Sequence, residues 1–185
     1  MHVGEYILAL VIIVLGLAIA DLAISTHRLI RRRADVKFDA APVLAALIAA
    51  YLVFLNFWGD YAHFRTVTSA GLWSTLPNLA ILFVNFLIAA AALPDEWEGN
   101  LDLWKFYLST RRQFWALIAI ADVIASIYNA VYNWPLPISV YASAMLTLVF
   151  AAILSVSERR WVHLFLASAF LAMLIFGTRD FVISG

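Results

Sequence analysis

Apolar residues in this chain come in six long runs that short polar segments separate. A helix of about 20 residues is roughly 30 Å long, which matches the hydrocarbon core of a bilayer. The runs cover residues 6–25, 40–58, 72–93, 114–132, 138–156 and 161–176. We therefore expect an all-α membrane protein, a bundle of about six transmembrane helices in one transmembrane domain over residues 1–185.

Polar and helix-breaking residues mark where the runs end. Pro94 closes the third run, and residues 133–137 (Asn-Trp-Pro-Leu-Pro) predict a tight turn, because proline cannot continue a helix. Residues 157–160 (Ser-Glu-Arg-Arg) predict the next reversal. No Lys or Arg precedes the first run, so we expect a membrane span there rather than a signal peptide.

The segment over residues 97–110 is more amphipathic than a simple connection. Its aromatic and leucine side chains alternate with acids and are followed by basic residues: Trp97, Leu101, Leu103, Trp104, Phe106, Tyr107 and Leu108. This pattern predicts a short helix that lies in the membrane interface, with Asn100 as its cap. Such a helix either anchors the third and fourth spans or acts in gating or docking.

The composition supports insertion in a membrane. Apolar residues make up 65% of the chain and charged residues 13%, and the mean hydropathy is +0.92, outside the range of soluble domains. An outer-membrane barrel would show alternation rather than unbroken runs. The formal net charge is zero, so nothing favours nucleic acid as a partner. The chain has no cysteine, which excludes disulfides and thiolate chemistry.

The distribution of positive charge predicts the orientation. With six spans, ten of the 12 Lys and Arg residues fall on one side: Arg28, Arg31, Arg32, Arg33, Lys37, Lys105, Arg111, Arg112, Arg159 and Arg160. The positive-inside rule then places this side in the cytoplasm and both termini outside, as for a bacterial cytoplasmic (inner) membrane protein. Aromatic residues flank the spans, as in interfacial belts: Tyr6, Trp58, Trp73, Trp97, Trp104, Trp115, Trp134 and Trp161.

One short similarity suggests an internal repeat. Residues 18–25 (AIADLAIS) in the first span resemble residues 119–126 (AIADVIAS) in the fourth. This pattern favours two inverted three-helix halves, although chance supplies such matches in a chain rich in Ala and Ile. In that arrangement Asp21 and Asp122 would face each other, and two close carboxylates would share one proton.

Asp122 is the polar residue placed deepest in the predicted membrane, about 12 Å along the fourth span. Ser126, Asn129 and Asn133 follow at steps of four, three and four, which puts all of them on one helix face. Charge within hydrocarbon is costly and therefore often functional. The stripe is either a route for ions, protons or substrate, or a hydrogen-bonded contact between helices.

Two other spans carry candidate interior residues. Asp21 lies near the cytoplasmic end of the first span, with Ser25 and Arg28 on its face, so it is either an ion-pair partner that orders this end or a functional carboxylate. Asn78 and Asn85 lie seven residues apart on one face of the third span, where we expect them to face the fourth.

The outer end of the second span repeats the same spacing with Asn56, Asp60 and His63. These side chains either form an outer vestibule that takes up cations or protons, or belong to a solvated helix end with belt aromatics.

Cofactor and enzyme signatures are absent from the sequence. The four histidines lie at different predicted depths, so haem is not expected, and no spacing typical of zinc or di-iron ligands occurs. The run of acids Asp95, Glu96, Glu98 and Asp102 is typical of a solvated face. We find no phosphate-binding loop or catalytic triad motif, so we expect neither a cofactor, a metal nor an enzyme.

These patterns lead to two hypotheses about function. The first is a small channel or transporter for ions, protons or a small solute, with Asp122, Asn129 and Asn85 along the route. The second is a non-catalytic sensor, assembly factor or complex subunit in which the same residues hold helices together. Membrane lipids are the expected partners, together with a second copy of the chain or another membrane protein.

Overall fold

The computed structural model describes residues 3–133 and 135–178. Within these residues six helices are long and apolar enough to cross a membrane, which confirms the predicted helical bundle. They are α1 (Val3–Arg31), α2 (Ala40–Phe64), α3 (Leu72–Ala92), α4 (Leu103–Tyr132), α5 (Ile138–Val156) and α6 (Arg160–Gly177).

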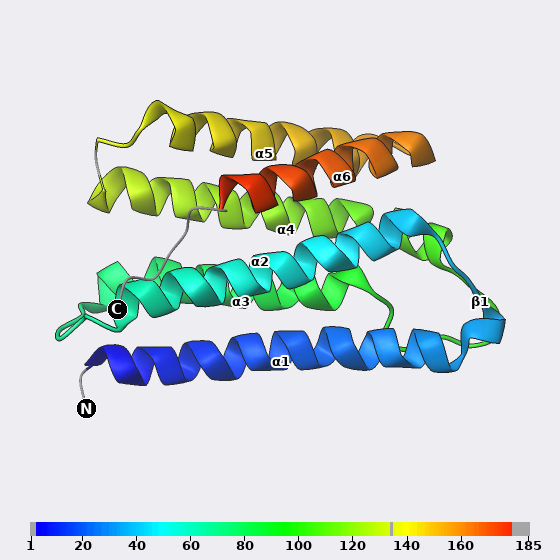
Figure 1. The fold of residues 1–185 in the computed structure, drawn as a ribbon, viewed down its shortest axis with the longest axis horizontal. Coiled ribbons are helices and arrows are strands. Elements are labelled where there is room, and N and C mark those ends of the chain that lie inside the picture. Colours follow the sequence, from blue (N-terminus) through cyan, green and yellow to red (C-terminus); the bar gives the residue numbers. More distant parts are fainter. Residues whose placement is uncertain (1–2, 134, 179–185) are drawn as a thin grey trace.

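Successive helices run in opposite directions, so the connections between them lie at the two ends of the bundle (Figure 1). We call the end with residues 32–39, 93–102 and 157–159 the basic end, because the ten clustered Lys and Arg residues lie in or beside these segments. The opposite end, which holds the start of α1 and the turn over residues 65–71, is called the terminal end.

The packing of the helices is not that of two equivalent halves. In the first half, α1, α2 and α3 all pack against one another. In the second half, α4 packs against α5 and α5 against α6, whereas the backbones of α4 and α6 are further apart and these two helices meet through large side chains. The halves join through α3 with α4 and through α2 with α6 (Figure 1). The expected repeat is therefore not visible in the helix packing.

Helix α6 is the shortest and covers only part of α2. Thr178, which follows its last residue, forms a hydrogen bond with Tyr51. Tyr51 lies 13 residues before the end of α2 at Phe64, or about 20 Å along the helix axis. The part of α2 nearer the terminal end is thus left uncovered by the described residues of α6.

The structure corrects the predicted interfacial helix. Residues 95–100 are not helical, and residues 103–110 are the first turns of α4, which continues without a break to Tyr132. Asp102, not Asn100, caps this helix, because its carboxylate accepts the backbone N–H groups of Trp104 and Lys105 at 3.1 and 3.2 Å. The 97–110 segment is therefore a loop followed by the start of a long helix.

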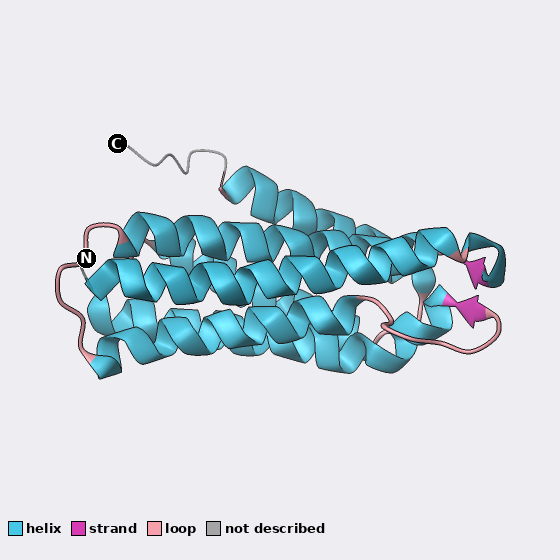
Figure 2. Ribbon diagram, turned by 90° about the horizontal axis from the view of Figure 1, so that it is seen from below, coloured by secondary structure: helices cyan, strands magenta, loops and turns pink. Residues whose placement is uncertain are grey.

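The connections at the basic end include two short strands that lie side by side (Figure 2), and ion pairs hold these connections together. Strand β1 (Val36–Lys37) pairs in parallel with β2 (Leu101–Asp102), and a short 3-10 helix η1 (Arg33–Asp35) precedes β1. Three ion pairs link different segments: Lys37–Asp102 at 3.2 Å, Arg111–Glu158 at 2.9 Å and Arg160–Asp39 at 2.5 Å. These contacts fix α2, α4 and α6 relative to one another.

At the terminal end, the start of α1 meets the turn between α2 and α3. The backbone N–H of Gly4 donates to the carbonyl oxygen of Val67 at 3.2 Å. A Cβ atom at Gly4 would overlap the carbonyl oxygen of Phe64 and lie 2.9 Å from that of Val67. Only glycine allows this close approach of two backbones.

Candidate functional site

The polar stripe on α4 continues the face that this helix buries. Trp115 and Ile118 are almost fully buried, and Asp122 and Ser126 follow at helical spacing on the same side. Asp122, Ser126 and Asn129 are half-buried. The amide of Asn133 donates to the side-chain oxygen of Asn129 at 2.9 Å, so the stripe ends in a hydrogen-bonded pair at the terminal end.

Asp122 is the least satisfied residue of this stripe. Its Oδ2 atom is buried and has no hydrogen-bond partner among the described residues. Burying a carboxyl oxygen without a partner costs free energy unless a proton, water or cation satisfies it.

Helix α3 contributes Asn85 and Asn78, as expected from their spacing. Asn85 is 5% exposed, lies in line with the buried Leu82 and Ala89, and forms no hydrogen bond with another described residue. Asn78 is half-buried on the same face, nearer the terminal end. The amide atoms of Asn85 are not among the fully buried atoms without a partner, which in the described residues are Asp122 Oδ2, Trp97 Nε1 and Arg111 Nε. The Asn85 amide is therefore less enclosed than the Asp122 oxygen.

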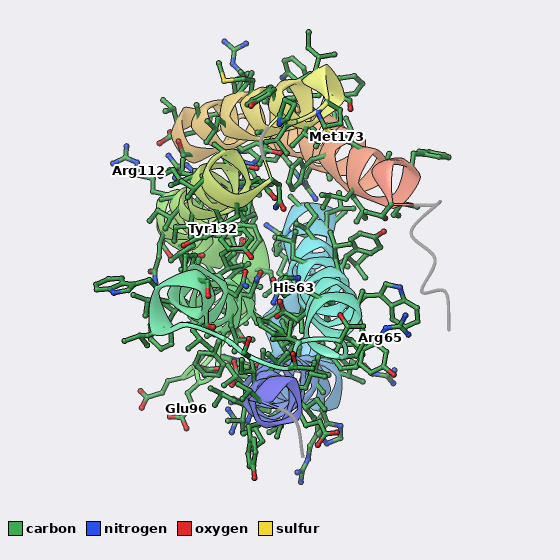
Figure 3. All side chains as sticks on the ribbon, turned by 90° about the vertical axis from the view of Figure 1, so that its left-hand side faces the viewer. His63, Arg65, Glu96, Arg112, Tyr132 and Met173 are labelled. Atoms are coloured by element: carbon green, nitrogen blue, oxygen red, sulfur yellow. The ribbon has the colours of Figure 1, made fainter. Side chains whose placement is uncertain are left out.

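Helix α2 contributes two of the three predicted vestibule residues. Asn56 and Asp60 are half-buried and follow the buried Ala49 and Val53 along one face. The Asn56 amide donates to Asp60 Oδ2 at 2.9 Å. His63 is exposed at the end of the helix, with its ring against Phe64 at a centroid distance of 4.8 Å. Figure 3 looks onto this end and labels His63, which belongs to the last turn of α2.

These residues lie within about 20 Å of the terminal end, with Asn85 the deepest because it is past the midpoint of α3. Asn56, Asn85 and Asp122 are eight, thirteen and ten residues from the terminal ends of their helices, or about 12, 20 and 15 Å. Helix α3 packs against both α2 and α4, which also contact each other. We call this set the polar half of the interior: Asn56, Asp60, Asn78, Asn85, Asp122, Ser126 and Asn129.

The other half of the interior is closed by aromatic rings. Trp115 and Phe114 of α4 are 0% and 1% exposed. Phe170 of α6 is 1% exposed and meets the Trp115 ring at a centroid distance of 5.7 Å. Trp115 lies seven residues, or about 10 Å, from Asp122 toward the basic end. The polar stripe therefore stops where this aromatic cluster begins.

A chain of buried hydrogen bonds holds the cluster. Trp115 Nε1–H donates to Tyr107 Oη at 2.9 Å, Tyr107 Oη donates to His163 Nδ1 at 2.8 Å, and His163 Nε2–H donates to the carbonyl oxygen of Ser157 at 3.0 Å. Because a carbonyl only accepts, the Ser157 contact places the proton on Nε2 and leaves Nδ1 as the acceptor. Each polar atom in the chain has a partner, and α4 is thereby tied to α6.

The sequence did not identify these residues as a group. It predicted that Tyr107 lies in an interfacial helix and that Trp115 belongs to an aromatic belt, but both are buried in the core. His163 is one of the four histidines for which the sequence predicts no haem, and it is fully buried. A histidine near the start of an apolar run could have suggested a buried hydrogen bond, but nothing in the sequence names its partner.

Asp21 is not part of the site. Helix α1 packs against α2 and α3, whereas α4 packs mainly against α3 and α5, so Asp21 and Asp122 do not face each other. The expected partners of Asp21 bind the loop after α3 instead: Ser25 donates to the Asp95 carboxylate at 3.0 Å, and Arg28 to its backbone carbonyl at 2.5 Å. Asp21 forms no ion pair with a described residue.

Asp102 is the carboxylate with the clearest electrostatic role outside the helices. Its hydrogen bond from the backbone of Lys105, and then its contact with the Lys37 ammonium, hold the pKa of this carboxyl below its ordinary value. The side chain therefore caps α4 in its charged form and pairs with β1.

No group of three His, Asp or Glu side chains that could hold a metal ion occurs in residues 3–133 and 135–178. Comparison with known proteins gives no assignment either: no protein-family model, curated protein or solved structure matches the chain. Any function must therefore be argued from the arrangement of the polar half and the aromatic cluster.

Proposed function

We propose that this chain is an integral membrane protein that moves protons or small cations, and that the polar half of the interior forms part of their route. The basic end then lies in the cytoplasm, because positive charge beside a span resists translocation, and the termini lie outside a bacterial cytoplasmic membrane. The six apolar helices and the separation of charge support this placement.

The observation that carries the proposal is the unpartnered oxygen of Asp122. An intramembrane carboxyl group that served only to join helices would be expected to have a hydrogen-bond partner across the interface. Asp122 instead lies on a helix that packs against α3, the helix that carries Asn85. A proton or a small cation on Asp122 would satisfy its free oxygen.

The route is proposed to be open toward the terminal end and closed toward the basic end. Asn129, Ser126 and Asp122 lead inward along α4, and the described residues of α6 do not cover the neighbouring part of α2. Beyond Asp122 the buried rings of Trp115 and Phe170 pack against each other, and the polar atoms of Trp115, Tyr107 and His163 are already paired. Transport to the basic end then requires that α6 move relative to α4, which breaks the bond between Tyr107 and His163.

Ion and proton flux into proteoliposomes tests the proposal. Asp122→Asn should lower flux at least about tenfold, because the loss of an interaction with a charged group costs ~1.5–3 kcal/mol. Asp35→Asn is the matched control, since it removes one carboxylate from the exposed η1 segment, and it should leave flux unchanged. Equal flux in wild type and Asp122→Asn would refute the role of Asp122.

One observation favours the second hypothesis, a non-catalytic membrane component. The hydrogen-bond chain through Trp115, Tyr107 and His163 has no unused donor or acceptor, as in a rigid structural core. On that hypothesis the protein carries no proton, sodium or potassium flux, while Asp122→Ala lowers its thermal stability in detergent. The flux assay thus separates the two hypotheses.

A further inference from the structure

A long apolar groove lies between α1 and α2 on the outside of the bundle, in the half nearer the basic end. Its volume is about 560 Å³. It extends over twelve residues of each helix, from Ile19 to Ile30 and from Phe54 to Val43. This corresponds to about 16 Å, or half of a hydrocarbon core of roughly 30 Å. The groove therefore has the length of the acyl region of one leaflet.

The walls of the groove are aliphatic and aromatic, and the small side chains of Ala23, Ala46 and Ala50 leave space along it. Close to its mouth at the basic end lie His27 of α1 and Phe38 of the following loop, both exposed. The groove is thus apolar along its length and meets polar residues only near the surface.

Two arginines beside this mouth have no partner. Arg31 follows His27 by one turn of α1, and Arg33 lies in η1, in the segment that leads to Phe38. Both are exposed, and neither side chain forms a hydrogen bond or ion pair with a described residue.

Their neighbours are already engaged. Arg28 donates to the carbonyl oxygen of Asp95, and Arg32 donates to that of Trp97 and lies 5.0 Å from the centre of its ring. Arg160 is paired with Asp39. The free positive charge on this side of α1 is therefore concentrated where the groove reaches the surface.

We propose that this groove binds one acyl chain of an anionic phospholipid whose phosphate is held by Arg31 and Arg33. A guanidinium group binds phosphate through two parallel hydrogen bonds, and basic residues at a membrane surface favour lipids with a net negative charge. The site requires membrane insertion but not transport, so a protein without flux would leave this proposal intact.

Native mass spectrometry of the protein in detergent tests the charge requirement. Phosphatidylglycerol is added in increasing amounts, and phosphatidylcholine with the same acyl chains serves as the comparison. The wild type should bind one phosphatidylglycerol more tightly than phosphatidylcholine. The double variant Arg31→Gln/Arg33→Gln should bind it about 25-fold more weakly, because each arginine near a membrane surface contributes roughly fivefold.

The matched control is Arg112→Gln/Arg159→Gln, which removes the same charge from exposed positions elsewhere at the basic end and should change the affinity less than about twofold. Equal affinity of the wild type for the two lipids would overturn the proposal. Equal losses in the two double variants would also overturn it, since general charge attraction would then explain the binding.

A second pair of variants tests the acyl-chain contact. Ala46→Trp should fill the groove and weaken phosphatidylglycerol binding without changing any charge, whereas Ala142→Trp adds the same side chain at an exposed position of α5. Unchanged affinity in Ala46→Trp would contradict this placement of the lipid. If Ala46→Trp does not fold, as judged by circular dichroism, the exposed arginine variants still decide the proposal.

Discussion

Asp122 and His163 are both polar residues within apolar helices, but their surroundings differ. His163 is fully buried, and both of its ring nitrogens have partners. Asp122 is half-buried and has a free buried oxygen. The sequence could identify Asp122, because an acid in an apolar run is unusual. It could not identify the hydrogen-bond chain through His163, because Tyr107 is 56 residues away in the sequence. An aromatic residue near a span boundary also fits an interfacial belt.

Tyr107→Phe should destabilise the bundle. It removes the acceptor of Trp115 Nε1–H and the donor to His163 Nδ1, and so leaves two buried polar atoms unpaired. Unsatisfied buried groups cost about 1–3 kcal/mol each. Reversible unfolding in mixed detergent micelles measures this loss, and Tyr132→Phe, at an exposed ring, should change stability by less than about 0.5 kcal/mol. Similar stability of the two variants would contradict the structural role of the chain.

The helices follow the apolar runs, but three of them are clearly longer than predicted. Helix α1 continues through Thr26 and Arg28 to Arg31, α2 continues to Phe64, and α4 begins at Leu103, well before its apolar run. Hydropathy detects only the part of a helix that fits in lipid, whereas hydrogen bonding and packing continue the helix beyond it. The same effect explains the error at residues 97–110. An amphipathic segment next to a span predicts a separate interfacial helix, but here its residues from Leu103 onward are the first turns of α4.

The cap of α4 should depend on pH. Because the folded pKa of Asp102 is lowered, its charged form stabilises the fold fully above the ordinary carboxyl value of 3.8, and this contribution is lost as the pH falls through the folded pKa. Asp102→Asn should therefore be less stable than wild type at neutral pH, and the difference should shrink in acid. Unfolding curves over a pH series measure it; a difference that does not vary with pH would contradict the charged cap.

At the scale of the whole molecule, the six apolar runs predicted which connections share an end, because successive spans reverse direction. The basic residues then cluster at one of these two ends, as predicted. The sequence also predicted that Asn85 and Asp122 belong to helices in contact. The arrangement in which Asp21 faces Asp122 is not found, because α1 and α4 are not a closely packed pair. A short sequence similarity does not determine which helices pack together. Helix contacts depend on many small apolar surfaces, and these look alike in a chain so rich in Ala, Ile and Leu.

The docking of α1 on the turn between α2 and α3 should depend on Gly4. Gly4→Ala forces a Cβ atom onto the carbonyl oxygen of Phe64, so α1 must move away and stability should fall by roughly 1–3 kcal/mol. Gly16→Ala is the matched control in the same helix, because nothing lies within 4 Å of its added Cβ. Thermal unfolding in detergent compares the two, and equal melting temperatures would refute this close contact.

The central claim is that the polar half of the interior is open to water from the terminal end. Because the chain has no cysteine, single Cys variants can be labelled with a membrane-impermeant thiol reagent in proteoliposomes. Asn129→Cys and Ser126→Cys should react from the side of the terminal end, whereas Ile127→Cys on the exposed apolar face and the buried Trp115→Cys should not. Absence of labelling at Ser126→Cys and Asn129→Cys, or labelling only from the basic end, would contradict this account.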